Sequence, residues 1–211
     1  MRITGIERRR GSRRITLQID HCLVVPLATE VFALWQLRAG DELTERRLKE
    51  IEAQQARHEA FSSAFRLLSY SPRSERELRD RLARRRVPPA LCDEVIARLQ
   101  ELSLIDDESF ARSYVERRDR SSPRGRRLLA QELRARGIAR PAIEGPVAAL
   151  DEPDAAYRAA ARRARSLASQ PYADFRRRLG DFLMRRGFEH EVAGETVARL
   201  WREQRSEGAA E

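Results

Sequence analysis

Apolar residues recur in this chain at steps of 51 and then 50 residues, starting near residue 59. Leu78, Leu129 and Leu179 form one such set. The same steps relate four further sets at helix-type positions: Leu82, Leu133 and Leu183; Ile96, Val147 and Val197; Leu99, Leu150 and Leu200; and Ala60, Ala111 and Ala161. A fixed period of this length is typical of tandem helical repeats. The pattern predicts three repeats, at residues 59–106, 107–150 and 151–202.

Within each repeat the apolar positions are spaced as on three helices. After a long helix that ends near Ser69, the expected helices of the first two repeats cover 74–86, 90–102, 108–119, 124–136 and 141–150.

Residues at the predicted helix ends support these boundaries. Ser74 followed by Glu77 predicts a capping box, and Ser122 is the expected cap of the helix over 124–136. Gly137 and Gly187 are placed where left-handed C-caps are expected.

One repeat has too few apolar positions for a robust core of its own. Stacked repeats share their apolar faces, so the expected fold is mainly α: tandem three-helix repeats that form a curved, elongated array. The tail at 203–211 has no apolar pattern and is expected to be frayed.

Residues 1–58 have a different pattern. Ile15, Leu17 and Ile19 alternate with polar residues, which predicts a half-buried strand. A strand over 3–8 precedes it across a turn, and a short third strand is expected over 22–27. This segment is therefore expected to be a small β-hairpin with helices attached.

Two helices are expected to follow the strands. The first covers 30–38, with Gly40 as its C-cap and these residues inward: Val31, Leu34, Trp35 and Leu37. Thr44 is the expected cap of the second, whose apolar face is formed by Leu48, Ile51, His58, Phe61, Phe65 and Leu68.

Five arginines crowd the hairpin turn: Arg8, Arg9, Arg10, Arg13 and Arg14. They are either a basic finger for phosphates or charges that keep an edge strand from pairing with another chain. We favour the second interpretation.

The composition gives the chain a positive net charge. The 211 residues include 42 Lys and Arg, of which only Lys49 is lysine, against 33 Asp and Glu, and the net charge is +9. An excess of this kind favours an anionic partner, although a GC-rich coding bias also enriches arginine. Apolar runs are too short to cross a bilayer, and the N-terminus lacks the apolar stretch of a secretory signal. Cys22 and Cys92 do not form a disulfide framework, so residence in the cytoplasm is expected.

Catalytic constellations are scarce in the sequence. The three histidines lie in different modules, and no phosphate-binding glycine loop or metal-ligand spacing is present. Cys22 and Cys92 are interpreted as core thiols. Asp106 and Asp107 precede an expected helix and are interpreted as its cap. An enzyme, a metal and a cofactor are therefore not expected.

Arginine placement is more informative than total charge. Residues 107–150 hold ten Arg against six Asp and Glu, the largest excess of any segment. Arg124, Arg126 and Arg127 fall at an expected helix N-terminus, which is unfavourable for cations, so a functional demand is inferred. Reversing these three charges is expected to leave the helix content intact. The candidate residues for binding DNA or an acidic protein are Arg84, Arg85, Arg117, Arg118, Arg120, Arg124, Arg126, Arg127, Arg134, Arg136, Arg185 and Arg186.

Four strings resemble the RecX family of bacterial regulatory proteins. They begin at Ser74 (SERELRDRL), Leu104 (LIDDESFARSYV), Pro123 (PRG, followed by QELRARGI) and Arg185 (RRGF). The resemblance covers residues 60–202. One departure is the string Arg86-Val87-Pro88-Pro89, where members commonly carry a basic residue and glycine.

The resemblance implies a protein that binds in the groove of the RecA–DNA filament. It implies inhibition of the recombinase and ATPase activities of RecA, a role in DNA repair and the SOS response, and weak, salt-dependent binding to single- and double-stranded DNA. Such a protein is expected to be a monomer without membrane contact. The alternative that the residues leave open is a stand-alone basic helical-repeat protein that binds nucleic acid.

Overall fold

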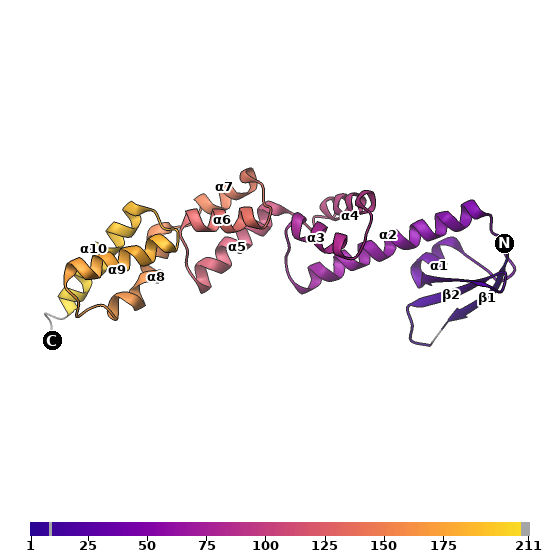
Figure 1. The fold of residues 1–211 in the computed structure, drawn as a ribbon, viewed down its shortest axis with the longest axis horizontal. Helices are drawn as coiled ribbons and strands as arrows, with labels where there is room; N and C mark the ends of the chain where they lie inside the picture. Colours follow the sequence, from indigo (N-terminus) through magenta and orange to yellow (C-terminus); the bar gives the residue numbers. More distant parts are fainter. Residues whose placement is uncertain (9, 208–211) are drawn as a thin grey trace. The chain divides into compact units, whose positions relative to one another are not determined.

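The chain divides into two compact units, which we describe separately. The computed structural model describes residues 1–8 and 10–207, and contains the strands and helices of Figure 1. One unit consists of Met1–Ser71 with Leu78–Glu101, and the other of Pro72–Glu77 with Leu102–Glu211. The mainly helical fold with a small N-terminal sheet is confirmed. Of the hairpin arginines, Arg9 lies outside the described residues, as do residues 208–211 of the expected tail.

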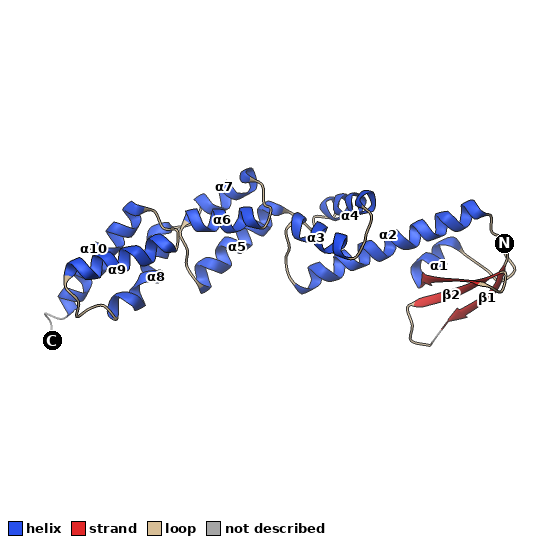
Figure 2. Ribbon diagram, viewed as in Figure 1, coloured by secondary structure: helices blue, strands red, loops and turns tan. Residues whose placement is uncertain are grey.

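A three-stranded antiparallel sheet opens the first unit (Figure 2). Its strands are β1 (Ile3–Arg8), β2 (Arg14–Ile19) and β3 (Leu23–Ala28), in the order β1-β2-β3. The alternating side chains Ile15, Leu17 and Ile19 are buried, as the pattern predicts. Arg14 pairs with Glu59 at 3.1 Å, and the role of the remaining turn arginines stays a prediction.

The helix after the sheet is shorter than expected. α1 covers Thr29–Trp35 and ends at Gln36, which has the left-handed conformation. Gly40 is therefore not its C-cap; the amide of Gly40 donates to the carbonyl of Ile3 at 2.9 Å. Leu34 is also misplaced by the prediction, since it is 65% exposed. Val31 and Leu37 are buried as expected.

The long helix α2 (Glu45–Tyr70) connects the sheet to the first repeat. Thr44 accepts a hydrogen bond from the amide of Arg47 and caps α2 as predicted. The buried face differs in its second half, where Ala60, Ala64 and Leu67 are buried while Phe65 is 52% exposed.

The rest of the first repeat is α3 (Glu75–Arg84) and α4 (Pro89–Glu101). The predicted core positions Leu78, Leu82, Ile96 and Leu99 are all buried. Arg86 follows α3 in the left-handed conformation, with φ of 60°. The family-atypical string at Arg86 thus keeps the backbone turn that glycine makes in the other repeats.

The second and third repeats form the second unit. Their helices are α5 (Asp107–Ser121), α6 (Arg126–Ala135), α7 (Arg140–Ala148), α8 (Glu152–Arg165), α9 (Tyr172–Arg185) and α10 (His190–Glu207). The predicted core leucines of both repeats are buried, among them Leu129 and Leu179. Ala161 is an exception, because its neighbour Ala160 takes the buried position in α8. α10 also continues to Glu207, beyond the end expected near residue 202.

The start of α6 corrects another expectation. Ser122 ends α5 instead of capping α6: its amide donates to the carbonyl of Arg118 at 2.8 Å. α6 begins at Arg126, with Gly125 as an N-cap that makes no side-chain bond. Arg124 therefore lies in the connection before α6 and not in its first turn.

Repeats two and three meet where the start of α6 contacts the turn after α9. Gly187 is in the left-handed conformation with φ of 83°, and a Cβ there would overlap the backbone of Leu128. A Cβ on Gly125 would overlap the backbone of Gly187. The amide of Gly125 donates to the carbonyl of Arg186 at 3.0 Å. Two backbones are thus in direct contact, with no side chain between them.

A related contact, made through side chains, joins the start of α3 to the turn after α6. Gly137 is left-handed, with φ of 85°, and its missing Cβ leaves room for the stem of Arg76. The Ser74 hydroxyl donates to the carbonyl of Arg136 at 2.7 Å and accepts from the amide of Glu77 at 3.2 Å. One half of the predicted capping box, the bond from the Glu77 amide to Ser74, is confirmed. The other half is not formed, because the Glu77 carboxylate pairs with Arg136.

We expect Gly187→Ala and Gly125→Ala each to destabilise the protein by about 2–4 kcal/mol, because neither backbone can withdraw from the other. Gly180→Ala is the control: it lies within α9, where a Cβ meets nothing within 4 Å, and it should stabilise by about 0.5–1 kcal/mol. Thermal denaturation followed by circular dichroism measures all three. A loss for Gly180→Ala equal to that for Gly187→Ala would contradict the contact.

Candidate nucleic-acid and protein interface

Carboxylates from the start of one repeat cap the middle helix of the repeat before it. Glu152, the first residue of α8, accepts from the amide of Arg126 at 2.9 Å. Asp107, the first residue of α5, accepts from the amide of Glu75 at 3.0 Å. In each case a negative charge meets the positive end of a helix dipole. The two junctions of this unit therefore share an electrostatic contact.

The neighbouring residues Asp106 and Asp107 have pKa values that are shifted in opposite directions. Asp106 caps α5, as predicted, by accepting from the amides of Glu108 and Ser109. The hydroxyl of Ser109 donates to it at 2.6 Å, which lowers the pKa of Asp106. Burial raises the pKa of Asp107. Each of the two carboxylates therefore caps a helix: Asp106 caps α5 and Asp107 caps α3. The sequence predicted only the cap of α5.

The arginines at the start of α6 bind carbonyl groups at the ends of other helices. The Arg126 guanidinium donates to the carbonyls of Ala148 at 3.1 Å and Leu150 at 2.7 Å, after α7. Arg127 donates to the carbonyl of Met184 at 2.9 Å, in the last turn of α9. These carbonyls carry the negative end of a helix dipole. The arrangement therefore gives Arg126 and Arg127 a stabilising role within the fold.

Tyr114 and Glu132 are the centre of a second cluster. The Tyr114 hydroxyl donates to Glu132 at 2.6 Å, and Arg118 donates to that hydroxyl at 3.1 Å. Arg124 pairs with Glu132 as well. Burial lowers the pKa of the Arg124 guanidinium, and the positive charge of Arg118 lowers it further. The Glu132 carboxylate therefore pairs with two guanidinium groups, those of Arg118 and Arg124.

The Tyr114 ring adds contacts with further arginines. The guanidinium carbons of Arg117, Arg118 and Arg136 lie 5.6, 5.2 and 5.0 Å from the ring centroid, within the range of cation–π attraction. Arg136 also pairs with Glu77. The cluster thus connects α5, α6 and the start of α3.

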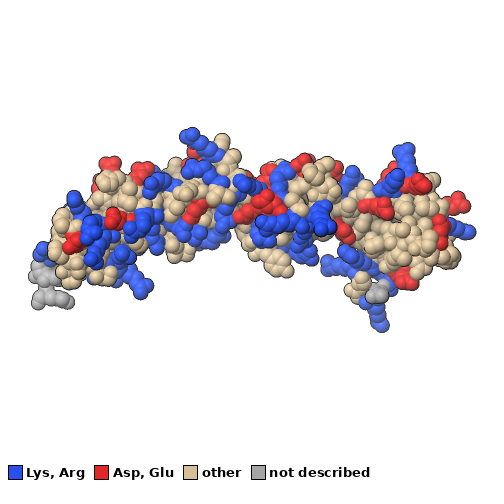
Figure 3. Space-filling model, in the orientation of Figure 1, with Lys and Arg blue, Asp and Glu red and all other residues tan. Residues whose placement is uncertain are grey.

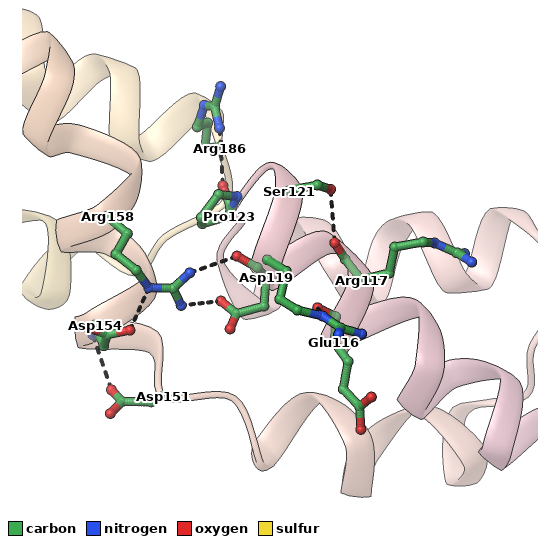
Figure 4. Close-up of polar contacts among 10 residues, drawn as sticks. Glu116, Arg117, Asp119, Ser121, Pro123, Asp151, Asp154, Arg158 and Arg186 are labelled. Carbon is green, nitrogen blue, oxygen red and sulfur yellow. Dashed lines mark hydrogen bonds and ion pairs between the residues drawn. The ribbon is translucent and has the colours of Figure 1, made fainter.

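Figure 4 shows a third set of contacts, between α5 and α8. Arg158 donates to the carbonyl of Asp119 at 2.7 Å and to its carboxylate at 2.6 Å, and it also binds Asp154 at 2.6 Å. These bonds raise the pKa of Arg158. Arg186, after α9, donates to the carbonyl of Pro123 at 3.1 Å.

The predicted site residues therefore fall into two groups. Those with bonds inside the second unit are Arg118, Arg124, Arg126, Arg127, Arg136 and Arg186. Arg127 is exposed although it is bonded, and the other exposed ones there are Arg117, Arg120, Arg134 and Arg185. None of these four pairs with a carboxylate among the described residues, and Arg120 donates to the carbonyl of Glu116 at 3.4 Å. Arg84 and Arg85 are exposed in the first unit, where Arg85 bonds to Ser63.

Basic side chains are spread over both repeats of the second unit on the face in view, with acidic ones between them (Figure 3). Sequence reasoning missed the acidic partners Asp119, Glu132 and Glu152. The signal available for Glu152 was its place at the start of a helix, where a carboxylate looks like an ordinary N-terminal residue. Among the described residues no three side chains of the metal-ligating types gather as a metal site, and no helix is long and apolar enough to cross a membrane.

Three family models match the helical repeats. Models described as the first, second and third three-helix domains of RecX match residues 60–99, 106–145 and 151–197. The chain belongs to the RecX family.

Relatives and solved structures agree with this family. Regulatory protein RecX of Levilactobacillus brevis is 27% identical over 208 residues, covering 94% of this chain and 76% of the relative. The Streptomyces lividans RecX is 34% identical over 149 residues, covering 69% and 79%. A crystal structure of regulatory protein RecX has a TM-score of 0.72 at 25% identity and covers 90% of this chain and 96% of its own. RecX from Lactobacillus salivarius, at 22% identity and a TM-score of 0.65, shows the same fold.

The contacts of Arg126 lead us to expect that charge reversal at this residue lowers stability. Arg126→Glu places a carboxylate beside Glu152, which is 1% exposed, so we expect a loss of about 3–5 kcal/mol. Arg134→Glu is the matched control, since it lies exposed on the same helix. Urea denaturation of both variants measures the difference. Equal stability of the two would show that the Arg126 bonds contribute nothing.

Asp107→Asn is expected to raise the thermal midpoint at neutral pH, because it keeps an acceptor for Glu75 and removes a charge that partial burial disfavours. The raised pKa means that the wild type loses stability as pH rises from the usual carboxyl range through that pKa, so the advantage of the variant grows there. Asp106→Asn should do the opposite: its lowered pKa stabilises the wild type above the usual range, and this stability is lost as pH falls. Melting curves from roughly pH 3 to 7 test both. An effect of Asp107→Asn that does not change with pH would be inconsistent with the shift.

Proposed function

We propose that this RecX-family protein is a non-enzymatic regulator of homologous recombination that binds the RecA–DNA filament and inhibits the recombinase and ATPase activities of RecA. The observation that carries the proposal is the presence of all three RecX domains in tandem on one chain. In this proposal the protein acts as a monomer in the cytoplasm, within the SOS response.

The charge distribution supports an anionic partner of this kind. Much of the arginine in the second unit is committed to bonds within the fold, as described for Arg126 and Arg158. The exposed group of Arg117, Arg120 and Arg134 is free of carboxylate partners among the described residues. Guanidinium groups of this type suit phosphate and carboxylate oxygens alike. The proposal therefore assigns contact with the filament to these exposed residues and a stabilising role to Arg126 and Arg158.

A strand-exchange assay and an ATPase assay with RecA of the same organism test the function. Inhibition is expected when the protein is present at or below the concentration of RecA. Unchanged RecA activity at equimolar protein would overturn the proposal.

The triple variant Arg117→Gln, Arg120→Gln, Arg134→Gln separates the two groups of arginines. It should keep the fold and raise the concentration needed for half-inhibition by about tenfold, because three charge contacts are lost. The control variant removes the same charge from three exposed arginines of the third repeat: Arg162, Arg165 and Arg178. If both variants inhibit equally well, the assignment of the exposed group is wrong.

A further inference from the structure

A small pocket lies at the junction of the second and third repeats. It has a volume of about 360 Å³ and is lined by Arg127, Leu128 and Gln131 of α6 and by Met184, Arg185 and Gly187 at the end of α9. Gly187, where the start of α6 meets the turn after α9 without a side chain between them, is part of this lining. The pocket is therefore part of the junction itself and is formed by its rigid backbone contact.

The polar side chains that line this pocket are those of two arginines and one glutamine. Arg127 uses one guanidinium nitrogen for the carbonyl of Met184, which fixes the side chain and leaves its other N–H groups available. Arg185 is exposed and has no ion pair among the described residues. Gln131 adds a carboxamide, also exposed. No carboxylate lines the pocket.

Two neighbouring pockets differ in this respect. The pocket between α6 and α7 contains Glu144, which already pairs with Arg140 at 2.7 Å. The pocket between α9 and α10 contains Asp174 and Asp181. In each of these pockets at least one arginine pairs with a carboxylate of the lining: Arg140 with Glu144, and Arg177 with Asp174. The junction pocket has no carboxylate in its lining.

We infer that the junction pocket formed by Arg127, Gln131 and Arg185 binds a backbone phosphate of DNA. A phosphodiester carries one full charge on two unbridged oxygens, which two guanidinium groups and a carboxamide bind from different sides. The inference rests on the proposed function, in that it takes the DNA of the filament as the anionic partner, and it names the pocket that touches this DNA.

The repeat register favours a nucleic-acid strand over a single acidic side chain. Arg76 precedes Arg127 by one repeat step of 51 residues, and its stem packs on Gly137, the counterpart of Gly187. A cation thus borders the equivalent turn at both junctions. Cations that recur with the repeat suit a polymer whose charges also recur at a regular spacing.

Fluorescence anisotropy of a labelled single-stranded oligonucleotide and of a duplex, with the full chain and no RecA, tests this site. Arg185→Gln and Gln131→Glu should each weaken binding by roughly five- to tenfold near 0.1 M salt, independently of base sequence. The slope of log affinity against log salt should fall by about 0.7–0.9 for Arg185→Gln. Both residues are exposed, and circular dichroism verifies the fold.

Arg165→Gln is the matched control, since it removes one exposed charge from α8, away from the lining of the pocket; it should change affinity by about twofold at most. Wild-type affinity in both pocket variants, or equal losses in variant and control, would overturn the inference, as would a wild type that binds no DNA at low salt. Variants that bind DNA normally but lose inhibition of RecA would assign the pocket to an acidic group of the protein partner, which also overturns it. If the pocket variants lose DNA binding while the wild type leaves RecA unaffected, the proposed function fails and the phosphate site stands.

Discussion

The helical repeats of the second unit depend on one contact: the first turn of a middle helix against the left-handed turn that ends the next middle helix. Backbone meets backbone at Gly125 and Gly187, so the position of α6 on α9 is fixed by atoms that do not change rotamer. Ser74 and Gly137 occupy the corresponding places on α3 and α6. Close packing of this kind tolerates little change in volume, and the surrounding polar contacts are arranged around it.

Arginine stabilises these contacts as well as providing surface charge. A helix end that is partly buried needs acceptors for its amides and donors for its carbonyls. Glu152 supplies the first at α6, while Arg126 and Arg127 supply the second at α7 and α9. The planar guanidinium reaches two carbonyls at once, as Arg126 does, which a lysine ammonium does less well. The use of arginine in place of lysine therefore has a structural reason at these positions, in addition to any coding bias of the genome.

The sequence allowed the repeats to be found because their core is periodic. Leu129 and Leu179, a helix-type set, are buried side chains on corresponding helices, and a fixed step reveals them without any structure. The junction could not be found in this way. The partners of Arg126 and Arg127 are main-chain carbonyls, which have no sequence identity, and Glu152 resembles any acidic residue at a helix start. Local pattern also failed at the end of α1, because the left-handed turn there is made by Gln36 and no glycine marks the position.

The two ends of the repeat series differ from its interior in a way that limits its length. In the first repeat the left-handed turn is made by Arg86, so a Cβ stands at the position where Gly187 meets the backbone of Leu128 directly. After the last, the register position of Gly125 is Phe175, buried within α9, which starts at Tyr172 and so covers that position with an additional turn. Neither end offers the backbone surface on which another copy would seat. A copy added before the first repeat would therefore need glycine at residue 86, and one added after the last repeat would need a shortened α9, whereas a copy of the middle repeat carries both contact positions, Gly125 and Gly137.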